Sequence, residues 1–187
     1  MPLLGETEFL APAPFLAGEY RIEAARHGWQ IAGCLALRRR VFCFEQKIFE
    51  NDDCDEIDKN CLLLAASSCM FGHEDEVVGT VRIHQPEPGL WWGSSLAVAI
   101  PFHRVGGLGA ALIRLAVGTA KAQGAAIFLA HVQAQNVKLF EAMDWRRLDE
   151  KLIHGRPHFL MAADLAAYDA LSDVALRVLP PAGRRAR

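Results

Sequence analysis

The pattern of apolar and polar residues predicts a domain in which strands and helices are mixed. Residues 20–25 alternate and predict a short first strand, whereas residues 29–46 repeat apolar side chains mostly at the helical period. Strand-like segments follow at 61–70, 76–84 and 90–100, separated by short breaks that contain glycine or proline. Because short connections join antiparallel neighbours, these three segments predict an antiparallel meander.

The second half of the chain returns to the helical period and then to strands. Apolar spacing after residue 106 predicts a helix that ends near Gln123, where Gly124 is a typical stop. Residues 125–133 predict a buried strand, residues 136–143 a short helix, and the segments on either side of "GRP" a final hairpin. About seven strands with one strand–helix–strand crossover predict an α/β fold, with a mixed, mostly antiparallel sheet and helices on both faces.

The length of 187 residues suits one domain with a sizeable core. We expect a loose N-terminal leader at residues 1–18, a single domain at 19–166 and a partly disordered tail at 167–187. The leader has no basic start, so it does not resemble a signal peptide. No apolar run in the sequence is long enough to span a membrane.

The amino-acid composition and the net charge restrict the kinds of molecule that this protein is expected to bind. Hydrophobic residues make up 52% and charged residues 22%, as in ordinary globular proteins. The formal net charge of −2 lacks the basic surplus of domains that bind nucleic acid. The five cysteines form no CxxC pair, which is typical of a reduced protein. We therefore expect a cytoplasmic monomer or homodimer with no nucleic-acid and no membrane partner.

Two segments invite comparison with metal sites. Asp53 and Asp55 have the spacing of a calcium-binding loop, but the glycine at its sixth position and the closing glutamate are missing. His154 and His158 lie four residues apart across a turn that contains proline, with no third ligand type nearby. We expect no metal ion.

The segment "HRVGGLGAALIRLA", residues 103–116, gathers three glycines where a helix begins. A P-loop would need a lysine after its last glycine, and a dinucleotide fingerprint would need a further glycine and a later carboxylate; both are missing here. Two interpretations stay equally open. The glycines form a turn that packs the helix against the sheet, or the free N–H groups of the first turn and Arg104 hold a pyrophosphate.

The same segment resembles a known family. Residues Arg104 to Gly109 match the RxxGxG signature of the GNAT N-acetyltransferases, after a strand reading "LAV" and before a helix. The segments "HVQAQNVKLFEAMDW", "GRPHFLM" and "LRRRVFCFEQ" with "DEID" are similar to other parts of these enzymes, and the resemblance covers roughly residues 20–165. More narrowly, "VGTVRIH", "PGLWWGSSLAV", "LAHVQAQNV" and "HGRPH" resemble a bacterial subfamily of nitrogen-starvation acetyltransferases, whose genes tend to lie near a nitrilase.

The resemblance implies that acetyl-coenzyme A is the cosubstrate and that its acetyl group passes directly to the amine of a small molecule. In this family the fourth and fifth strands splay apart, the fourth strand pairs with the pantetheine arm, and a backbone N–H, here near Val98, stabilises the oxyanion. The implied coenzyme-binding residues are Leu96, Ala97, Val98, Arg104, Val105, Gly106, Gly107, Leu108, Gly109, Ala110, Asn136 and Phe140.

The residues that bind and deprotonate the acceptor are less clearly marked. A general base is expected because an alkylammonium must lose a proton before it attacks. The candidates, in this order, are His84, Glu45 and His131, and each of them is also typical of an ordinary surface or core position. The candidate acceptor-binding residues are Phe42, Gln46, Trp92, Arg156 and His158.

One position departs from the family pattern. Many members carry a tyrosine that protonates the leaving thiolate, whereas this chain has Phe140 there and only two tyrosines, Tyr20 and Tyr168, elsewhere. The thiolate would then leave unaided or take a proton from water. Two alternatives stay open: a coenzyme-binding sensor without turnover, and a protein like the acyl-homoserine lactone synthases, whose first helix and acidic segment look like residues 37–62 here.

Overall fold

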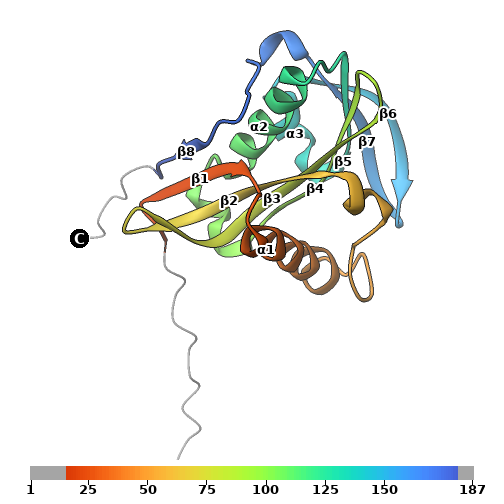
Figure 1. Ribbon diagram of the computed structural model, residues 1–187. Coiled ribbons are helices and arrows are strands. Elements are labelled where there is room, and N and C mark those ends of the chain that lie inside the picture. The colour runs from red at the N-terminus through yellow and green to blue at the C-terminus, as the bar shows by residue number, and fades with distance from the viewer. Residues whose placement is uncertain (1–15, 181–187) are drawn as a thin grey trace, which may run out of the picture.

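The structure is a computed structural model that describes residues 16–180, apart from the side chain of Arg104. Most of the expected leader, and residues 181–187 of the expected tail, lie outside the described residues. The described chain forms one sheet with helices packed against it (Figure 1). Among residues 16–180, no helix is both long and apolar enough to cross a membrane.

Eight strands form a single sheet in the order β6-β7-β5-β4-β3-β2-β1-β8 (Figure 1). Every neighbouring pair is antiparallel except β4 and β5, which are parallel. This confirms the expected mixed, mostly antiparallel sheet. The strands are β1 (Glu19–Ala24), β2 (Leu62–Met70), β3 (His73–Glu87), β4 (Leu90–Val98), β5 (Ile127–Gln133), β6 (Trp145–Ile153), β7 (Arg156–Ala163) and β8 (Leu176–Val178).

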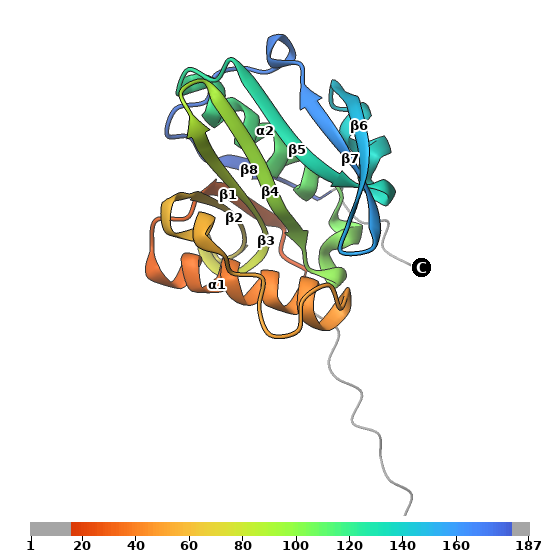
Figure 2. The ribbon, with the colours of Figure 1, turned by 90° about the vertical axis from the view of Figure 1, so that its right-hand side faces the viewer.

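Helices cover both faces of the sheet, as predicted (Figures 1 and 2). Helix α1 (Gly28–Arg39) lies on one face, and α2 (Leu108–Ala122) with the short α3 (Val137–Glu141) lies on the other. The chain continues from α1 as a π-helical turn, Arg40–Glu45, in which the Gln46 N–H donates to the Val41 carbonyl five residues back. Such turns are frequent at functional sites. Short 3₁₀ helices span Glu56–Asn60, Ile100–Val105, Ala134–Asn136 and Leu165–Ala167.

The main core lies between the sheet and α2. Leu112, Leu115 and Val117 of that helix are buried, together with Phe128 of β5 and Met161 of β7. Burial of these apolar side chains favours the folded state. It also fixes the start of α2 beside the end of β4, which is where the site described below forms.

Strands β4 and β5 separate part-way along their length. Their parallel pairing runs from Leu90 to Gly93 and then stops. Just beyond, Ser95 has a φ of 51°, and the register with β3 shifts between Thr80 and Arg82. An extra residue of this kind is a β-bulge, which bends its strand. The bulge turns the end of β4 away from β5, and the predicted splay is confirmed.

The sheet has one strand more than the seven expected. Strand β8 pairs antiparallel with β1, from Tyr20 opposite Val178 to Ile22 opposite Leu176, within the segment expected to be a partly disordered tail. Three residues are too few for a recognisable alternation. This strand is defined by its partner, because β1 would otherwise leave an unpaired edge.

Candidate functional site

A cavity of about 490 Å³ lies at the start of α2, and we call it the glycine cavity. The end of β4, the turn after α1 and the segment before α3 form its other walls. Nine of the twelve expected coenzyme-binding residues line it, namely Leu96, Ala97, Val98, Gly106, Gly107, Leu108, Gly109, Ala110 and Asn136.

The glycines at the start of α2 face open space. Gly106 and Gly107 have φ angles of 75° and 80°, which glycine adopts readily. A Cβ atom at Gly106 would have no neighbour within 4 Å, and one at Gly109 would meet only Leu139 Cδ2, at 3.8 Å. Close packing therefore does not explain these glycines, and the anion-site interpretation is the one that the geometry favours.

The first turn of α2 has free hydrogen-bond donors. The N–H of Ala111 donates to the Gly107 carbonyl at 2.8 Å, so the preceding N–H groups at positions 108–110 have no acceptor within the helix. These groups lie at the positive end of the dipole of a 15-residue helix. A turn of this kind can bind an anion, and it opens onto the cavity.

The end of β4 offers a free backbone edge to the same cavity. Ala97 and Val98 pair with β3 on one side, whereas β5 parts from β4 after Gly93 on the other. The His103 ring Nε2 lies 2.8 Å from the Val98 carbonyl, to which it donates. An extended ligand can lie along this edge as an added strand.

A second cavity, of about 260 Å³, lies in the splay between β4 and β5, and we call it the splay cavity. Gln46, Leu96 and Asn136 line both cavities, so the two meet at these residues. One wall is apolar and includes Val81, Ile113, Ala116, Phe128, Phe140 and Trp145. The opposite wall is polar and includes Asp53, Asp55, Arg82, His131, Gln133 and His158.

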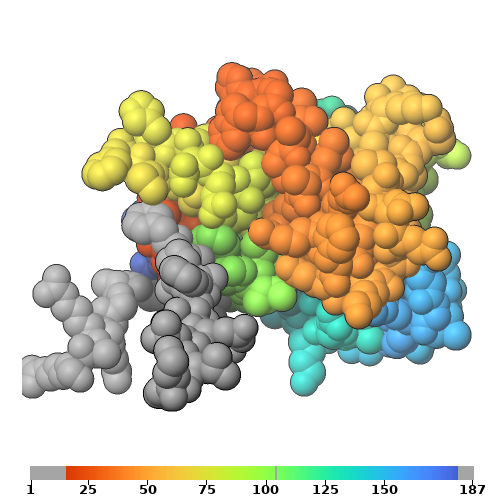
Figure 3. Space-filling view, turned by 90° about the horizontal axis from the view of Figure 1, so that it is seen from below, coloured from red at the N-terminus to blue at the C-terminus, as the bar shows by residue number. Residues whose placement is uncertain are grey.

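Buried ion pairs hold the polar wall in place. Arg38, which has no exposed surface, donates from Nε to Asp53 at 2.7 Å and from Nη1 to Asp58 at 2.5 Å. Arg82 donates to Asp55 at 2.6 Å and lies 2.9 Å from Asp58. The two arginines, one on α1 and one on β3, thus anchor the acidic loop that passes over this face of the molecule (Figure 3).

This cluster carries an excess of negative charge, because three carboxylates face two guanidinium groups. Burial opposes ionisation of Asp58, but hydrogen bonds from Arg38 lower its pKa far below the usual range. Arg82 likewise lowers the pKa of Asp55 against the effect of burial. Among the described residues, Asp53 Oδ1 is buried with no hydrogen-bond partner.

His131 is the expected base candidate that lines the splay cavity. Its ring lies against Trp92, with centroids 5.1 Å apart. Burial, then the charges of Lys151 and His158, lower the pKa of His131, which favours the neutral ring. The His158 Nδ1 lies 2.9 Å from the Arg156 carbonyl, to which it donates.

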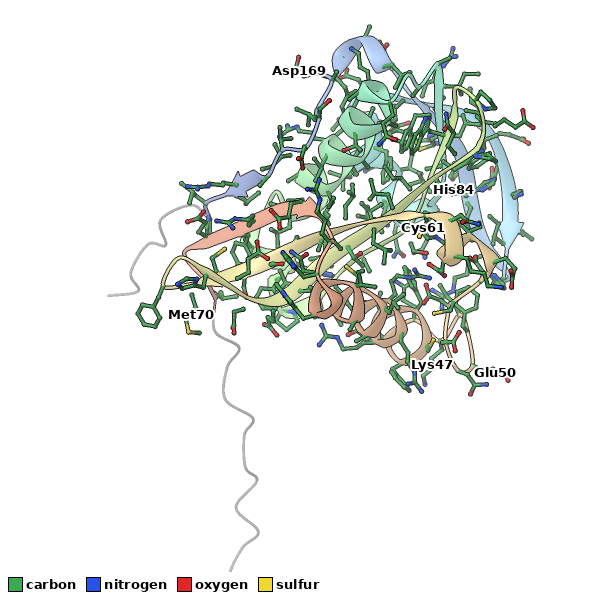
Figure 4. All side chains as sticks on the ribbon, viewed as in Figure 1. Lys47, Glu50, Cys61, Met70, His84 and Asp169 are labelled. Carbon is green, nitrogen blue, oxygen red and sulfur yellow. The ribbon has the colours of Figure 1, made fainter. Side chains whose placement is uncertain are left out.

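The other two base candidates lie elsewhere. His84 is on β3, next to the position where β2 begins after Cys61, and it is not part of either cavity wall (Figure 4). Burial and the nearby charge of Arg82 lower its pKa. Glu45 lines the glycine cavity, and its carboxylate lies 3.8 Å from the Arg40 guanidinium.

The loop after α1 and the β6–β7 hairpin meet over the splay cavity. Gln133 Nε2 donates to Gln46 Oε1 at 3.0 Å, and the Arg156 guanidinium donates to the Gln46 carbonyl. Phe49 packs edge-on against His154, with centroids 4.9 Å apart. These contacts roof the cavity, and Gln46, Phe49, Gln133 and His154 are among its lining residues.

The tyrosine hydroxyls do not reach the cavities. Phe140 is buried and packs edge-on against Trp145, with centroids 4.9 Å apart. Behind that indole, Tyr168 accepts a hydrogen bond from Trp145 Nε1 at 3.0 Å and donates to the Met143 carbonyl. Within residues 16–180, no tyrosine lines either cavity.

The remaining expected residues divide into three groups. Phe42, Gln46 and His158 line the splay cavity, Trp92 lies beside it, and Arg156 is in its roof. Val105 is buried in the core instead of facing a cavity. The side chain of Arg104 lies outside the described residues.

Sequence reasoning missed the charged cluster. Arg38 belongs to a run of three arginines, and Asp53 and Asp55 belong to a run of acidic residues. Each run alone is typical of a solvated surface. Only the helical period, which turns Arg38 toward the side of Cys34 and Leu37, distinguishes it from Arg39 and Arg40.

Comparisons with known proteins agree with this geometry. A sequence model described as the acetyltransferase (GNAT) family matches residues 24–145. A putative N-acetyltransferase from Lactobacillus plantarum has a similar fold, with a TM-score of 0.68, 20% identity and coverage of 78% of this chain and 98% of its own. An acyl-CoA N-acyltransferase from Pseudomonas aeruginosa has a TM-score of 0.60, 19% identity and coverage of 77% and 97%. No curated protein matches the sequence.

The family match covers more than half of the chain and includes β4, the glycine turn and α2. It therefore implies an acyltransferase that uses an acyl-coenzyme A as cosubstrate, in agreement with the anion-binding turn and the splayed strands. The chain belongs to the acetyltransferase (GNAT) family.

Proposed function

We propose that this protein transfers an acyl group, such as acetyl, from acyl-coenzyme A to the amine of a small molecule. The open glycine turn beside the splay cavity is the observation that carries this proposal. A pyrophosphate on the turn and a pantetheine arm along β4 place the thioester where the two cavities meet. Direct transfer is then favoured because both reactants occupy one cleft.

His131 is the general base in this proposal. Its neutral ring faces the splay cavity and takes the proton of the amine. The amine nitrogen bonds to the acyl carbon, and the carbon–sulfur bond then breaks to release the thiolate. A backbone N–H near Val98 holds the oxyanion in between. The thiolate leaves without help from a tyrosine, or takes its proton from water.

The acceptor in this proposal is a small cationic amine. The polar wall belongs to a cluster with one carboxylate more than it has guanidinium groups. Such a wall attracts an ammonium group, and attraction of this kind is strengthened where water is excluded. The roof at Gln46 and Arg156 favours a compact acceptor over a long polymer.

The test is an assay of thiol release from acetyl-coenzyme A with a panel of amines, with the N-acylated product identified by mass. We expect release that depends on the amine, and the fastest release with amines that carry a second cationic group. Calorimetric binding of coenzyme A without release by any amine would support the sensor alternative. A product formed from S-adenosylmethionine would support the lactone-synthase alternative.

A further inference from the structure

We propose that the acyl donor carries a chain longer than acetyl, with its hydrocarbon tail in the apolar part of the splay cavity. This inference rests on the proposed acyl transfer, and it concerns which donor is used. It is carried by the polarity, the size and the position of the cavity.

The far wall of the splay cavity offers a ligand no polar partner. It is formed by Ile113 and Ala116 of α2, Phe128 of β5, and Phe140 and Trp145, all of them buried. The one polar group among these side chains, Trp145 Nε1, already donates to the Tyr168 hydroxyl at 3.0 Å. An amine placed here would lose its hydrogen bonds to water without replacement. A hydrocarbon chain would gain from leaving water.

The cavity is larger than an acetyl group needs. The whole splay cavity, which the tail shares with the acceptor at the polar wall, has a volume of about 260 Å³. An apolar protein cavity of about 150 Å³ is enough to hold benzene, which has six carbon atoms. The two carbons of acetyl would leave much of the apolar wall without contacts, and unfilled apolar volume is unfavourable in a protein.

The cavity also begins where the acyl chain would enter. Leu96 lines both cavities, on the stretch of β4 proposed to hold the thioester. Small residues line the cavity where the two strands part: Gly93 and Ser94 on β4 and Ala130 on β5. A Cβ atom at Gly93 would lie 3.0 Å from the Phe128 ring, so the glycine keeps this part of the wall from overcrowding. A tail that continues from the thioester therefore runs between the strands toward α2.

The experiment measures the dissociation constants of coenzyme A and of its acetyl, butyryl, hexanoyl, octanoyl and decanoyl thioesters by calorimetry on the full chain. This readout does not depend on the acceptor. We expect affinity to rise by about fourfold for each methylene group until the cavity is full. The heat-capacity change on binding should become more negative over the same range.

Ala116→Leu fills the apolar wall and should remove the gain in affinity of hexanoyl and longer donors over acetyl-coenzyme A, with both measured in the same variant. Ala122→Leu is the matched control, because this residue is on the same helix but outside the splay cavity. Ile113→Ala enlarges the cavity and should move the optimum to a longer chain, so the inference stays testable if Ala116→Leu does not fold.

Equal affinity for all the thioesters, or a gain that Ala116→Leu leaves unchanged, would overturn the inference while leaving acyl transfer intact. Failure of coenzyme A itself to bind would instead contradict the proposed function.

Discussion

The two cavities differ in the parts of the chain that form their walls. Two short stretches, 96–98 and 106–110, supply eight of the seventeen residues that line the glycine cavity, among them its three glycines. The splay cavity is formed by side chains that are far apart in sequence, such as Phe42, Asp53 and His158. The first depends on local backbone conformation, and the second depends on the whole fold.

The two cavities therefore have different structural requirements. An anion-binding turn needs two residues with positive φ and an open approach to the N–H groups, which three glycines provide. The splay cavity needs buried carboxylates that are held by arginines from other elements, since a buried charge that loses its partner is costly. The glycine turn should therefore tolerate changes elsewhere in the fold, whereas the splay cavity should not.

The largest effect is expected from breaking the buried cluster. Arg38→Met leaves Asp53 without its guanidinium partner and leaves Asp58 with Arg82 alone. The free energy of unfolding should fall by about 3–5 kcal/mol, as for other buried pairs that lose one member. Urea denaturation followed by circular dichroism measures it. In the wild type, the lowered pKa of Asp58 gives stability at neutral pH that is lost on acidification, and the variant should show a weaker pH dependence.

Arg39→Met is the matched control, because the neighbouring arginine is exposed and donates only to the Asn51 carbonyl among the described residues. Its effect should be about 0.5 kcal/mol or less. Equal destabilisation by both substitutions would contradict the special role of Arg38.

The next effect tests the side-chain chemistry of the splay cavity. His131→Gln removes the proposed base and should lower kcat/KM by about 100-fold, which is typical of lost general base catalysis. Because burial lowers the pKa of His131, wild-type activity should fall only below the ordinary histidine pKa of about 6.5. That acid limb should disappear in the variant.

His84→Gln tests the competing assignment. His84 also has a lowered pKa but does not line the cavity. A 100-fold fall in kcat/KM for His84→Gln, with little change for His131→Gln, would identify His84 on β3 as the general base.

A smaller effect is expected at the backbone site. Gly109→Ala places a methyl group where the protein has room, because Leu139 Cδ2 would be 3.8 Å away. Alanine should raise the free energy of unfolding by about 1 kcal/mol, since it is the better helix former. Affinity for coenzyme A should nevertheless fall by about tenfold, because the methyl group blocks the approach of phosphate to the N–H groups. Calorimetry measures the affinity and urea denaturation the stability.

Gly28→Ala is the control for this substitution. Gly28 begins α1, and a Cβ atom there would also have no neighbour within 4 Å. It should give a similar gain in stability with unchanged affinity for coenzyme A. Unchanged affinity in Gly109→Ala would mean that the phosphates bind elsewhere.

The same difference explains how far the sequence could predict the structure. Hydrophobic periodicity was sufficient for β1–β5, β7, α1, α2 and α3, because apolar side chains of these elements enter the core. Strand β6 is largely exposed after Trp145, and its prediction came from its place beside the GRP turn. The glycine turn was visible because its requirement is local. Arg38 and Asp53 are 15 residues apart, and nothing in either neighbourhood indicates that they form a pair. Strand β8 was missed for the same reason, since its strand partner among the described residues, β1, lies about 155 residues earlier in the chain.

The smallest effect tests whether the splay cavity lacks a proton donor. Tyr168→Phe removes a hydroxyl that bonds Trp145 Nε1 and the Met143 carbonyl behind the apolar wall. The free energy of unfolding should fall by about 1 kcal/mol, because two polar groups lose a partner. The hydroxyl is screened from the cavity by the Trp145 ring, and burial raises its pKa, so it should not serve the thiolate. Turnover of acyl-coenzyme A by Tyr168→Phe should therefore equal that of the wild type under conditions where both are folded. A tenfold fall in kcat with unchanged KM would show that Tyr168 supplies the proton that Phe140 cannot.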